Sequence, residues 1–180
     1  MNKYHVNKED AVLVIIDIQE RLMSAMAKRD QVYKNTALLI ETAKQLGIPV
    51  IVSEQYPRGL GPTAAEIKDH LEEYQNIEKI SFSIGEKLLN IMPPERKTMI
   101  ITGTETHVCV FQTVRDMVAA GYNVHVAKDA VCSRFEINYN SGLELMRDLG
   151  AVITNTETVV FDLLKISGTP EFKSISPLLK

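Results

Sequence analysis

The chain has 180 residues, 45% hydrophobic and 24% charged, a composition typical of a globular domain that buries about 70% of its unfolded surface. Its 20 basic and 23 acidic residues leave a net charge of −3, so no basic excess is available to neutralise a phosphate backbone, and we expect no nucleic-acid partner. No apolar run approaches the roughly 20 residues that cross a membrane, which argues against a membrane-spanning helix.

Apolar periodicity predicts strands that alternate with helices along the whole chain. Residues 11–16 form a continuous β-branched run, typical of a strand covered on both faces. Residues 54–63 are rich in Gly and Pro and predict a long loop over one end of a sheet. We expect strands or extended segments at 11–16, 49–53, 77–83, 98–102, 123–127 and 151–154, and helices at 30–46, 63–71 (capped by Thr63), 84–91, 107–120, 138–149, 157–164 and 172–180.

This alternation predicts one α/β domain over residues 1–180, with a mainly parallel sheet. Right-handed crossovers place the carboxyl ends of all parallel strands at one edge, where such sheets bind ligands. Asp17 follows the first expected strand and Cys109 follows the fourth, while the Gly/Pro loop follows the second. We therefore expect these three features to face one crevice.

Cys109 lies in a segment that runs from a buried strand through a turn at Gly103 into the start of a helix. The N–H groups and positive dipole end of a helix start favour an anion, so the Cys109 thiol is predicted to ionise more easily than a free thiol. Cys109 is therefore a candidate nucleophile. The same position also fits a small buried core residue.

Asp17 and Lys79 are the other reactive side chains expected at this edge. Asp17 also fits a helix cap or turn, and Lys79 also fits a solvated lysine on an edge strand. Together with Cys109 they would supply a carboxylate to take the proton of the thiol, a cation to hold the thiolate and a sulfur to attack a carbonyl carbon. The residues alone take the prediction no further than a cysteine hydrolase.

Three segments resemble the signatures of the isochorismatase-like cysteine hydrolase superfamily. They are Asp17-Ile18-Gln19, Lys79 with Ser81-Phe82-Ser83, and Gly103-Thr104-Glu105-Thr106-His107-Val108-Cys109-Val110. Residues 54–63, 124–130 and 133–134 are similar to the branch called isochorismatase domain-containing proteins. The likeness covers nearly the whole chain.

The resemblance implies a fold and a catalytic triad. The fold would be a three-layer, Rossmann-like α/β/α sandwich with a six-stranded parallel sheet in the order 3-2-1-4-5-6. Cys109 would be the nucleophile, Asp17 the general base that later protonates the leaving group, and Lys79 the stabilising cation. A cis peptide between Thr104 and Glu105 would turn the Glu105 N–H toward the Cys109 N–H, so that the two donors form an oxyanion hole.

Departures from related branches narrow the expected chemistry. Nicotinamidases carry an Asp-x-His metal motif after the second strand, where this chain has Ser53-Glu54-Gln55-Tyr56-Pro57, so we expect no metal and no cofactor. True isochorismatases generally lack the cysteine that is present here. Cys109 therefore favours hydrolysis of an amide, imide or similar C–N bond in a small molecule, through a covalent thioester.

Further side chains are expected to contact the substrate. Gln19, Gln55 and Tyr56 would line the crevice if the Gly/Pro loop closes over it, although Tyr56 could merely pack. Phe82 would wall the pocket, and His107 would contact the substrate or cap the helix start.

Other properties follow from the cysteine count and the chain ends. Cys132, the only other cysteine, fits an incidental loop residue, and residues 1–10 are polar and contain no signal-peptide core. A cytoplasmic setting follows as the default. The apolar residues beyond 157 would pack on the sheet or dock on a neighbouring subunit, and the family resemblance favours a homo-oligomer.

The sequence is also compatible with two other functions. The first is a scaffold or interaction protein that retains the pocket without using it. The second is a thiol redox sensor, which would need a resolving partner, and Cys132 is not at Cys-x-x-Cys spacing from Cys109. The sequence names neither the substrate nor the size of an oligomer.

Overall fold

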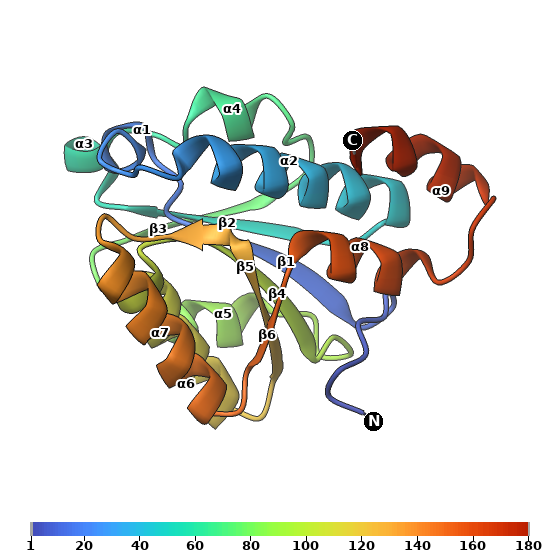
Figure 1. The fold of residues 1–180 in the computed structure, drawn as a ribbon. Coiled ribbons are helices and arrows are strands. Elements are labelled where there is room, and N and C mark those ends of the chain that lie inside the picture. Colours follow the sequence, from blue (N-terminus) through green and yellow to red (C-terminus); the bar gives the residue numbers. More distant parts are fainter. Residues whose placement is uncertain (1, 180) are drawn as a thin grey trace.

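A six-stranded parallel sheet forms the middle layer of the structure, a computed structural model described over residues 2–179 (Figure 1). The sheet order is β3-β2-β1-β4-β5-β6, and all five strand pairs are parallel, which confirms the predicted fold class and strand order. The strands are β1 (Ala11–Ile16), β2 (Val50–Gln55), β3 (Gln75–Lys79), β4 (Thr98–Thr104), β5 (Asn123–Cys132) and β6 (Val152–Thr154).

Helices cover both faces of this sheet (Figure 1). One face carries α1 (Glu20–Met23), α2 (Arg29–Leu46), α4 (Ala65–Lys68), α8 (Thr156–Leu164) and α9 (Pro170–Ile175). The other carries α5 (Gly85–Ile91), α6 (Phe111–Ala119) and α7 (Glu136–Asp148). A short helix, α3 (Pro57–Leu60), lies at the end of the sheet near α1, and the chain also forms a π-helical turn at Thr106–Val110 and a 3₁₀ turn at Ser176–Leu179.

The central strand explains why the sheet needs two helical layers. Leu13 and Ile15 of β1 pack into the α2 side, whereas Val14 and Ile16 pack into the α6 side. Successive residues of a strand point to opposite faces, and all four side chains are buried because helices cover both faces. An apolar run without alternation is therefore the pattern of a strand covered on both sides.

The C-terminal segment packs against the body of the same chain. Val160 and Leu163 of α8 and Ile175 of α9 join the buried cluster that β1 and α2 form. This arrangement agrees with the predicted packing of the tail on the sheet. No helix within residues 2–179 is both long and apolar enough to span a lipid bilayer.

The predicted loop at 54–63 is wrong at its start and in its middle. β2 continues through Gln55, which pairs with Lys79 of β3, and α3 occupies Pro57–Leu60. Thr63 does not cap a helix through its side chain; its hydroxyl and N–H both donate to Glu54 Oε1 instead, at 2.7 and 2.6 Å. The following helix, α4, is only four residues long.

Other boundaries also differ from the predictions. β3 begins at Gln75 and ends at Lys79, so Ser81 to Ser83, expected to be extended, lie beyond the strand. β4 and β5 are longer than expected, because they pair again after a bulge, up to Thr104 and Cys132. α1 was not predicted, and the expected helix from 107 is a π-helical turn followed by α6.

Candidate active site

Asp17, Lys79 and Cys109 meet at the carboxyl edge of the sheet. Asp17 directly follows β1, Lys79 is the last residue of β3, and Cys109 lies in the π-helical turn that follows β4. Their residues are 0%, 3% and 6% exposed. The structure therefore brings together the three side chains that the sequence singled out, in a nearly closed site.

The carboxylate of Asp17 has a defined hydrogen-bond environment. Lys79 Nζ donates to Asp17 Oδ2 at 2.6 Å, and Ser53 Oγ donates to Asp17 Oδ1 at 2.7 Å. Asp17 and Lys79 form an ion pair in which both side chains are 0% exposed. Each carboxylate oxygen has two lone-pair sites, so each oxygen can accept a further proton donor.

The ammonium of Lys79 has three acceptors for its three protons. Besides Asp17, these are Gln55 Oε1 at 2.7 Å and the backbone oxygen of Phe82 at 3.0 Å. Removing both charges from water costs several kcal/mol per ion, and additional hydrogen bonds are needed to offset that cost. These contacts fix the position of the Lys79 charge beside Asp17.

The backbone around Asp17 is held by the two neighbouring strands. Its N–H donates to the backbone oxygen of Ser53 at 3.1 Å, and Thr104 Oγ1 donates to the backbone oxygen of Asp17 at 2.7 Å. Asp17 has a positive φ of 51°, a conformation that Asp tolerates better than most residues. The main chain thus turns sharply at the end of β1 and directs the carboxylate into the site.

Gly103 allows β4 to approach β1 at this point. Its φ is 124°, and a Cβ at this position would lie 2.0 Å from the backbone oxygen of Ile16. Only glycine fits such an approach, which places the residues that follow β4 beside Asp17.

Burial and the nearby Asp17 carboxylate together raise the pKa of the Cys109 thiol to about 12, because the lowering effect of Lys79 is smaller than the raising effect of Asp17. The prediction of an easily ionised thiol is therefore wrong for the resting protein. Desolvation of the anion and the nearby carboxylate outweigh the ammonium. At neutral pH the thiol is protonated and interacts with both members of the ion pair.

The turn that carries Cys109 has an unusual backbone. The peptide bond between Thr104 and Glu105 is cis. The backbone oxygen of Glu105 accepts hydrogen bonds from the N–H groups of Val108 at 3.0 Å and Val110 at 3.3 Å. Within residues 2–179, the N–H of Glu105, which lies between β4 and the π-helical turn, and the N–H of Cys109 make no backbone hydrogen bond outside the helices and strands. π-helical turns of this kind are frequent at functional sites.

Gln19 lies in a different environment from the predicted one. It is fully buried, and its Nε2 donates to the backbone oxygens of Gln55 at 3.0 Å and Gly61 at 2.6 Å. Its Oε1 accepts from the Gln55 N–H at 2.7 Å. Gln19 therefore holds the segment after β2, which corrects the expectation that it lines the crevice. The side chain of Gln55 in turn accepts from Lys79 Nζ through Oε1 and donates through Nε2 to the backbone oxygen of Ile80 at 2.9 Å.

The other expected contact residues are more accessible. Tyr56 and Phe82 are each 54% exposed. The backbone of each contacts Lys79: the Tyr56 N–H donates to the backbone oxygen of Lys79 at 2.8 Å, and the backbone oxygen of Phe82 accepts from Lys79 Nζ. His107 is partly buried, with Nδ1 3.0 Å from Ser133 Oγ. The two rings can therefore contact a molecule that approaches from solvent.

Ser53 was missed by the sequence analysis, although a signal was present. It is the one polar residue within the predicted strand 49–53, and it pairs with Ile16 immediately before Asp17. A hydroxyl at the carboxyl end of a buried strand, one position from a carboxylate, could have been recognised as its partner. Within residues 2–179, no group of three or more His, Cys, Asp or Glu side chains is arranged to hold a metal ion.

Comparisons with known proteins support the resemblance. The profile of the family described as "Isochorismatase domain" matches residues 11–158. The chain is 40% identical over 177 residues to "Secreted isochorismatase effector Isc1" of Phytophthora sojae, covering 94% of this chain and 84% of that protein. It is 33% identical over 180 residues to "Isochorismatase domain-containing protein 2" of Xenopus laevis, covering 97% and 85%.

A solved structure is also similar over nearly the whole fold. The structure of "MAR1 Ribonuclease from Caenorhabditis elegans" has a TM-score of 0.90 and 34% sequence identity to this chain. The match covers 97% of this chain and 92% of that one.

Proposed function

Because the chain belongs to the isochorismatase family of hydrolases, we propose that it cleaves an amide, imide or similar C–N bond of a small molecule through a thioester on Cys109. The observation that supports this proposal most directly is the position of the Cys109 thiol beside a buried ion pair of Asp17 and Lys79. A thiol, a carboxylate and an ammonium together provide the nucleophile, the base and the cation that such a reaction uses.

The first step is proton transfer from Cys109 to Asp17. A thiol with a pKa of about 12 stays protonated at neutral pH, so the proton leaves for the carboxylate as the sulfur attacks the carbonyl carbon. A C–S bond forms, and the electrons of the carbonyl π bond move to oxygen. Lys79 stays charged throughout and balances the negative charge that passes from Asp17 to the sulfur and the carbonyl oxygen.

The tetrahedral intermediate then breaks down toward the thioester. Asp17 returns its proton to the substrate nitrogen, the C–N bond breaks, and ammonia or an amine leaves. Water, deprotonated by Asp17, next attacks the thioester, releases the carboxylic acid and regenerates the Cys109 thiol. Asp17 thus acts alternately as base and acid, in the position that Lys79 and Ser53 fix.

The N–H groups of Glu105 and Cys109 are the proposed donors to the oxyanion. Within residues 2–179, neither N–H makes a backbone hydrogen bond outside the helices and strands. Backbone donors of this kind need no reorganisation during the reaction, and each typically contributes about 3–4 kcal/mol to transition-state stabilisation.

We propose a small molecule rather than RNA as the substrate, although the similar Caenorhabditis elegans structure is titled a ribonuclease. The net charge of −3 offers no general attraction for a phosphate backbone, and the reactive groups are almost completely buried. Incubating the protein with single-stranded RNA tests this choice. Cleavage that persists in a Cys109→Ala variant would be independent of the proposed site.

A non-catalytic scaffold is the second function considered, because Cys109 is only 6% exposed. Release of ammonia from a panel of amides and imides distinguishes the two functions. We expect wild-type protein to release ammonia from at least one compound and Cys109→Ala to release none above background. Absence of release from the whole panel, with no covalent adduct on Cys109, would favour the scaffold.

A further inference from the structure

Glu105 and Arg134 form a contact next to the π-helical turn Thr106–Val110, which carries Cys109 and is called the nucleophile turn below. The backbone N–H of Arg134 donates to Glu105 Oε2 at 3.0 Å, and Arg134 Nε lies 3.2 Å from both carboxylate oxygens. The side chain of Glu105 is 9% exposed, whereas that of Arg134 is 53% exposed. Arg134 therefore reaches from the surface to hold a carboxylate that is nearly buried.

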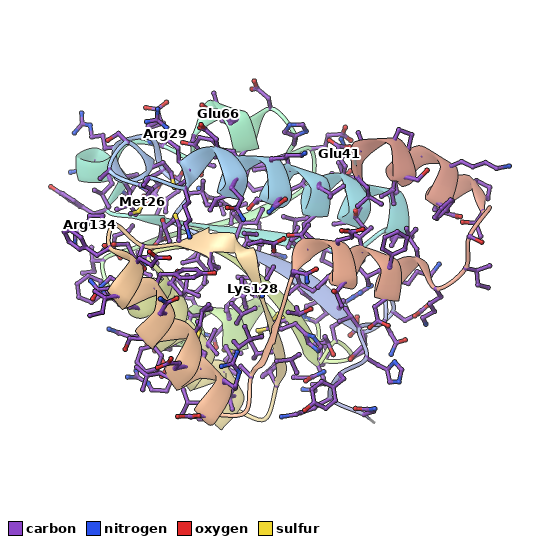
Figure 2. All side chains as sticks on the ribbon, viewed as in Figure 1. Met26, Arg29, Glu41, Glu66, Lys128 and Arg134 are labelled. Atoms are coloured by element: carbon purple, nitrogen blue, oxygen red, sulfur yellow. The ribbon has the colours of Figure 1, made fainter. Side chains whose placement is uncertain are left out.

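Arg134 comes from a different part of the chain than the turn it contacts. It lies in the loop between β5 and α7, and Figure 2 places it at the same end of the molecule as α1 and α3, which follow β1 and β2. Its neighbour Ser133 contacts His107. Two consecutive loop residues thus hold two residues of the segment that leads to Cys109.

α7 supports the same turn through close backbone packing. A Cβ on Gly142 would lie 3.0 Å from the Cα and N of His107 and from the oxygen of Thr106. The loop and the helix that follow β5 therefore restrain the nucleophile turn from one side. Within residues 2–179, the loop after β5 also forms an ion pair with Glu105, the residue directly before this turn.

Glu105 also determines how the turn begins. Its backbone oxygen accepts from Val108 and Val110, on either side of Cys109 in the sequence, and its own N–H is one of the two proposed oxyanion donors. A shift of the Glu105 side chain would therefore move the peptide groups that surround the reacting carbonyl oxygen. Misplacement by about 1 Å can lower a rate about 100-fold.

We propose that Arg134 is a positioning residue that acts through Glu105 to hold the two oxyanion donors in place. This inference rests on the proposed function, because the donors matter only if a carbonyl carbon is attacked by Cys109. Arg134 does not touch the reacting atoms. An exposed guanidinium adds little to folding stability, so its main effect is expected on the rate of acyl transfer.

The test compares two reagents that both modify Cys109. Attack on p-nitrophenyl acetate creates an oxyanion, whereas alkylation by iodoacetamide displaces iodide at a saturated carbon and creates none. We expect Arg134→Ala to lower acylation about 10- to 100-fold and to leave the alkylation rate within about twofold of wild type. The residual N–H of residue 134 keeps one hydrogen bond to Glu105, so the loss is not complete.

Four further variants define the role: Arg134→Lys, Glu105→Gln, its combination with Arg134→Ala, and Arg147→Ala. Arg134→Lys, which keeps a charged donor, is expected to recover part of the acylation rate. The double variant Glu105→Gln, Arg134→Ala is expected to be acylated no more slowly than the slower of the Glu105→Gln and Arg134→Ala single variants, because both changes remove the same contact. Arg147→Ala, an exposed arginine on α7, is the matched control and should acylate as wild type does.

Equal loss of both rates in Arg134→Ala, or no loss of either, would overturn the positioning role. A thermal melt of each variant identifies any loss that comes from unfolding, and Arg134→Lys keeps the test valid if the alanine variant does not fold. Failure of wild-type protein to form an acetyl adduct on Cys109 would refute the proposed function instead. The two proposals therefore fail in different ways.

Discussion

Lys79 Nζ lies 2.6 Å from Asp17 Oδ2, and neither side chain is exposed to solvent. A buried ion pair is weak support for stability as such, because desolvation offsets the attraction. Removing one partner, however, leaves an uncompensated charge in the interior. The pair therefore links the stability of the fold to the chemistry of Cys109.

Lys79→Met is predicted to destabilise the protein by about 3–5 kcal/mol, because it leaves the Asp17 carboxylate without its cation. Denaturant unfolding measures this loss. Lys68→Met, an exposed lysine on α4, should change the free energy of unfolding by no more than about 0.5 kcal/mol. The double variant Asp17→Asn, Lys79→Met should lose less free energy of unfolding than the two single variants lose in sum. Strict additivity of the two losses would show that the pair is not energetically coupled.

Ser53→Ala removes one of the two side-chain hydrogen bonds to Asp17. We expect a loss of about 1–2 kcal/mol in stability, since a buried acceptor loses its donor. We also expect acylation of Cys109 to slow about 10-fold or more, because the base is less firmly placed. Stopped-flow release of p-nitrophenolate measures the rate. A Ser53→Ala variant that acylates at the wild-type rate would exclude Ser53 from positioning the base.

The stability of the protein is predicted to fall as pH rises from 9 toward 12. Burial raises the pKa of both Cys109 and Cys132 from 9.0 to about 12, so in this window the unfolded thiols lose protons that the folded thiols keep. Each thiol then lowers the free energy of unfolding by about 1.4 kcal/mol per pH unit. Below pH 9 this stability is fully present.

Cys132→Ala removes one of the two thiols and keeps Asp17, Lys79 and Cys109. Its free energy of unfolding should fall less steeply with pH than that of wild type between pH 9 and 11. Guanidinium titrations at several pH values measure the two slopes. Parallel slopes in both proteins would contradict a raised pKa for Cys132.

Gly103→Ala is predicted to destabilise the protein by about 3 kcal/mol or more, because its Cβ would collide with the Ile16 oxygen at 2.0 Å. Gly121→Ala is the matched comparison: its φ is also positive, at 84°, but no atom lies within 4 Å of the added Cβ. Both variants place alanine at a positive φ, so the additional fall in melting temperature of Gly103→Ala over Gly121→Ala reports the collision alone. Equal losses would show that β4 can move away from β1.

Much of the fold could be predicted because apolar runs report directly which segments are buried. Residues 11–16 are apolar throughout since both faces of the sheet are covered, and the prediction matches β1. The end of β2 could not be predicted, because it depends on residues distant in sequence: Gln55 pairs with Lys79 of β3, and Gln19 binds both the N–H and the backbone oxygen of Gln55. No local pattern near Gln55 encodes that contact.

The candidate site was predictable in its membership but not in its electrostatics. Strand ends of a parallel sheet share one edge, which was enough to bring Asp17, Lys79 and Cys109 together. The pKa of Cys109 depends on burial and on the distance to a carboxylate, and neither can be obtained from its place at the start of a helix. The compartment, the assembly state and the role of each residue stay predictions.

Mass analysis of the protein after a single exposure to p-nitrophenyl acetate tests the central claim most directly. We predict one acetyl group on Cys109 in wild-type protein, none on Cys132, and a rate of modification at least about 10-fold lower in Asp17→Asn, which lacks the base. Acetylation of other residues with Cys109 unmodified, or an undiminished rate in Asp17→Asn, would contradict the proposal that Asp17 activates Cys109 as the nucleophile.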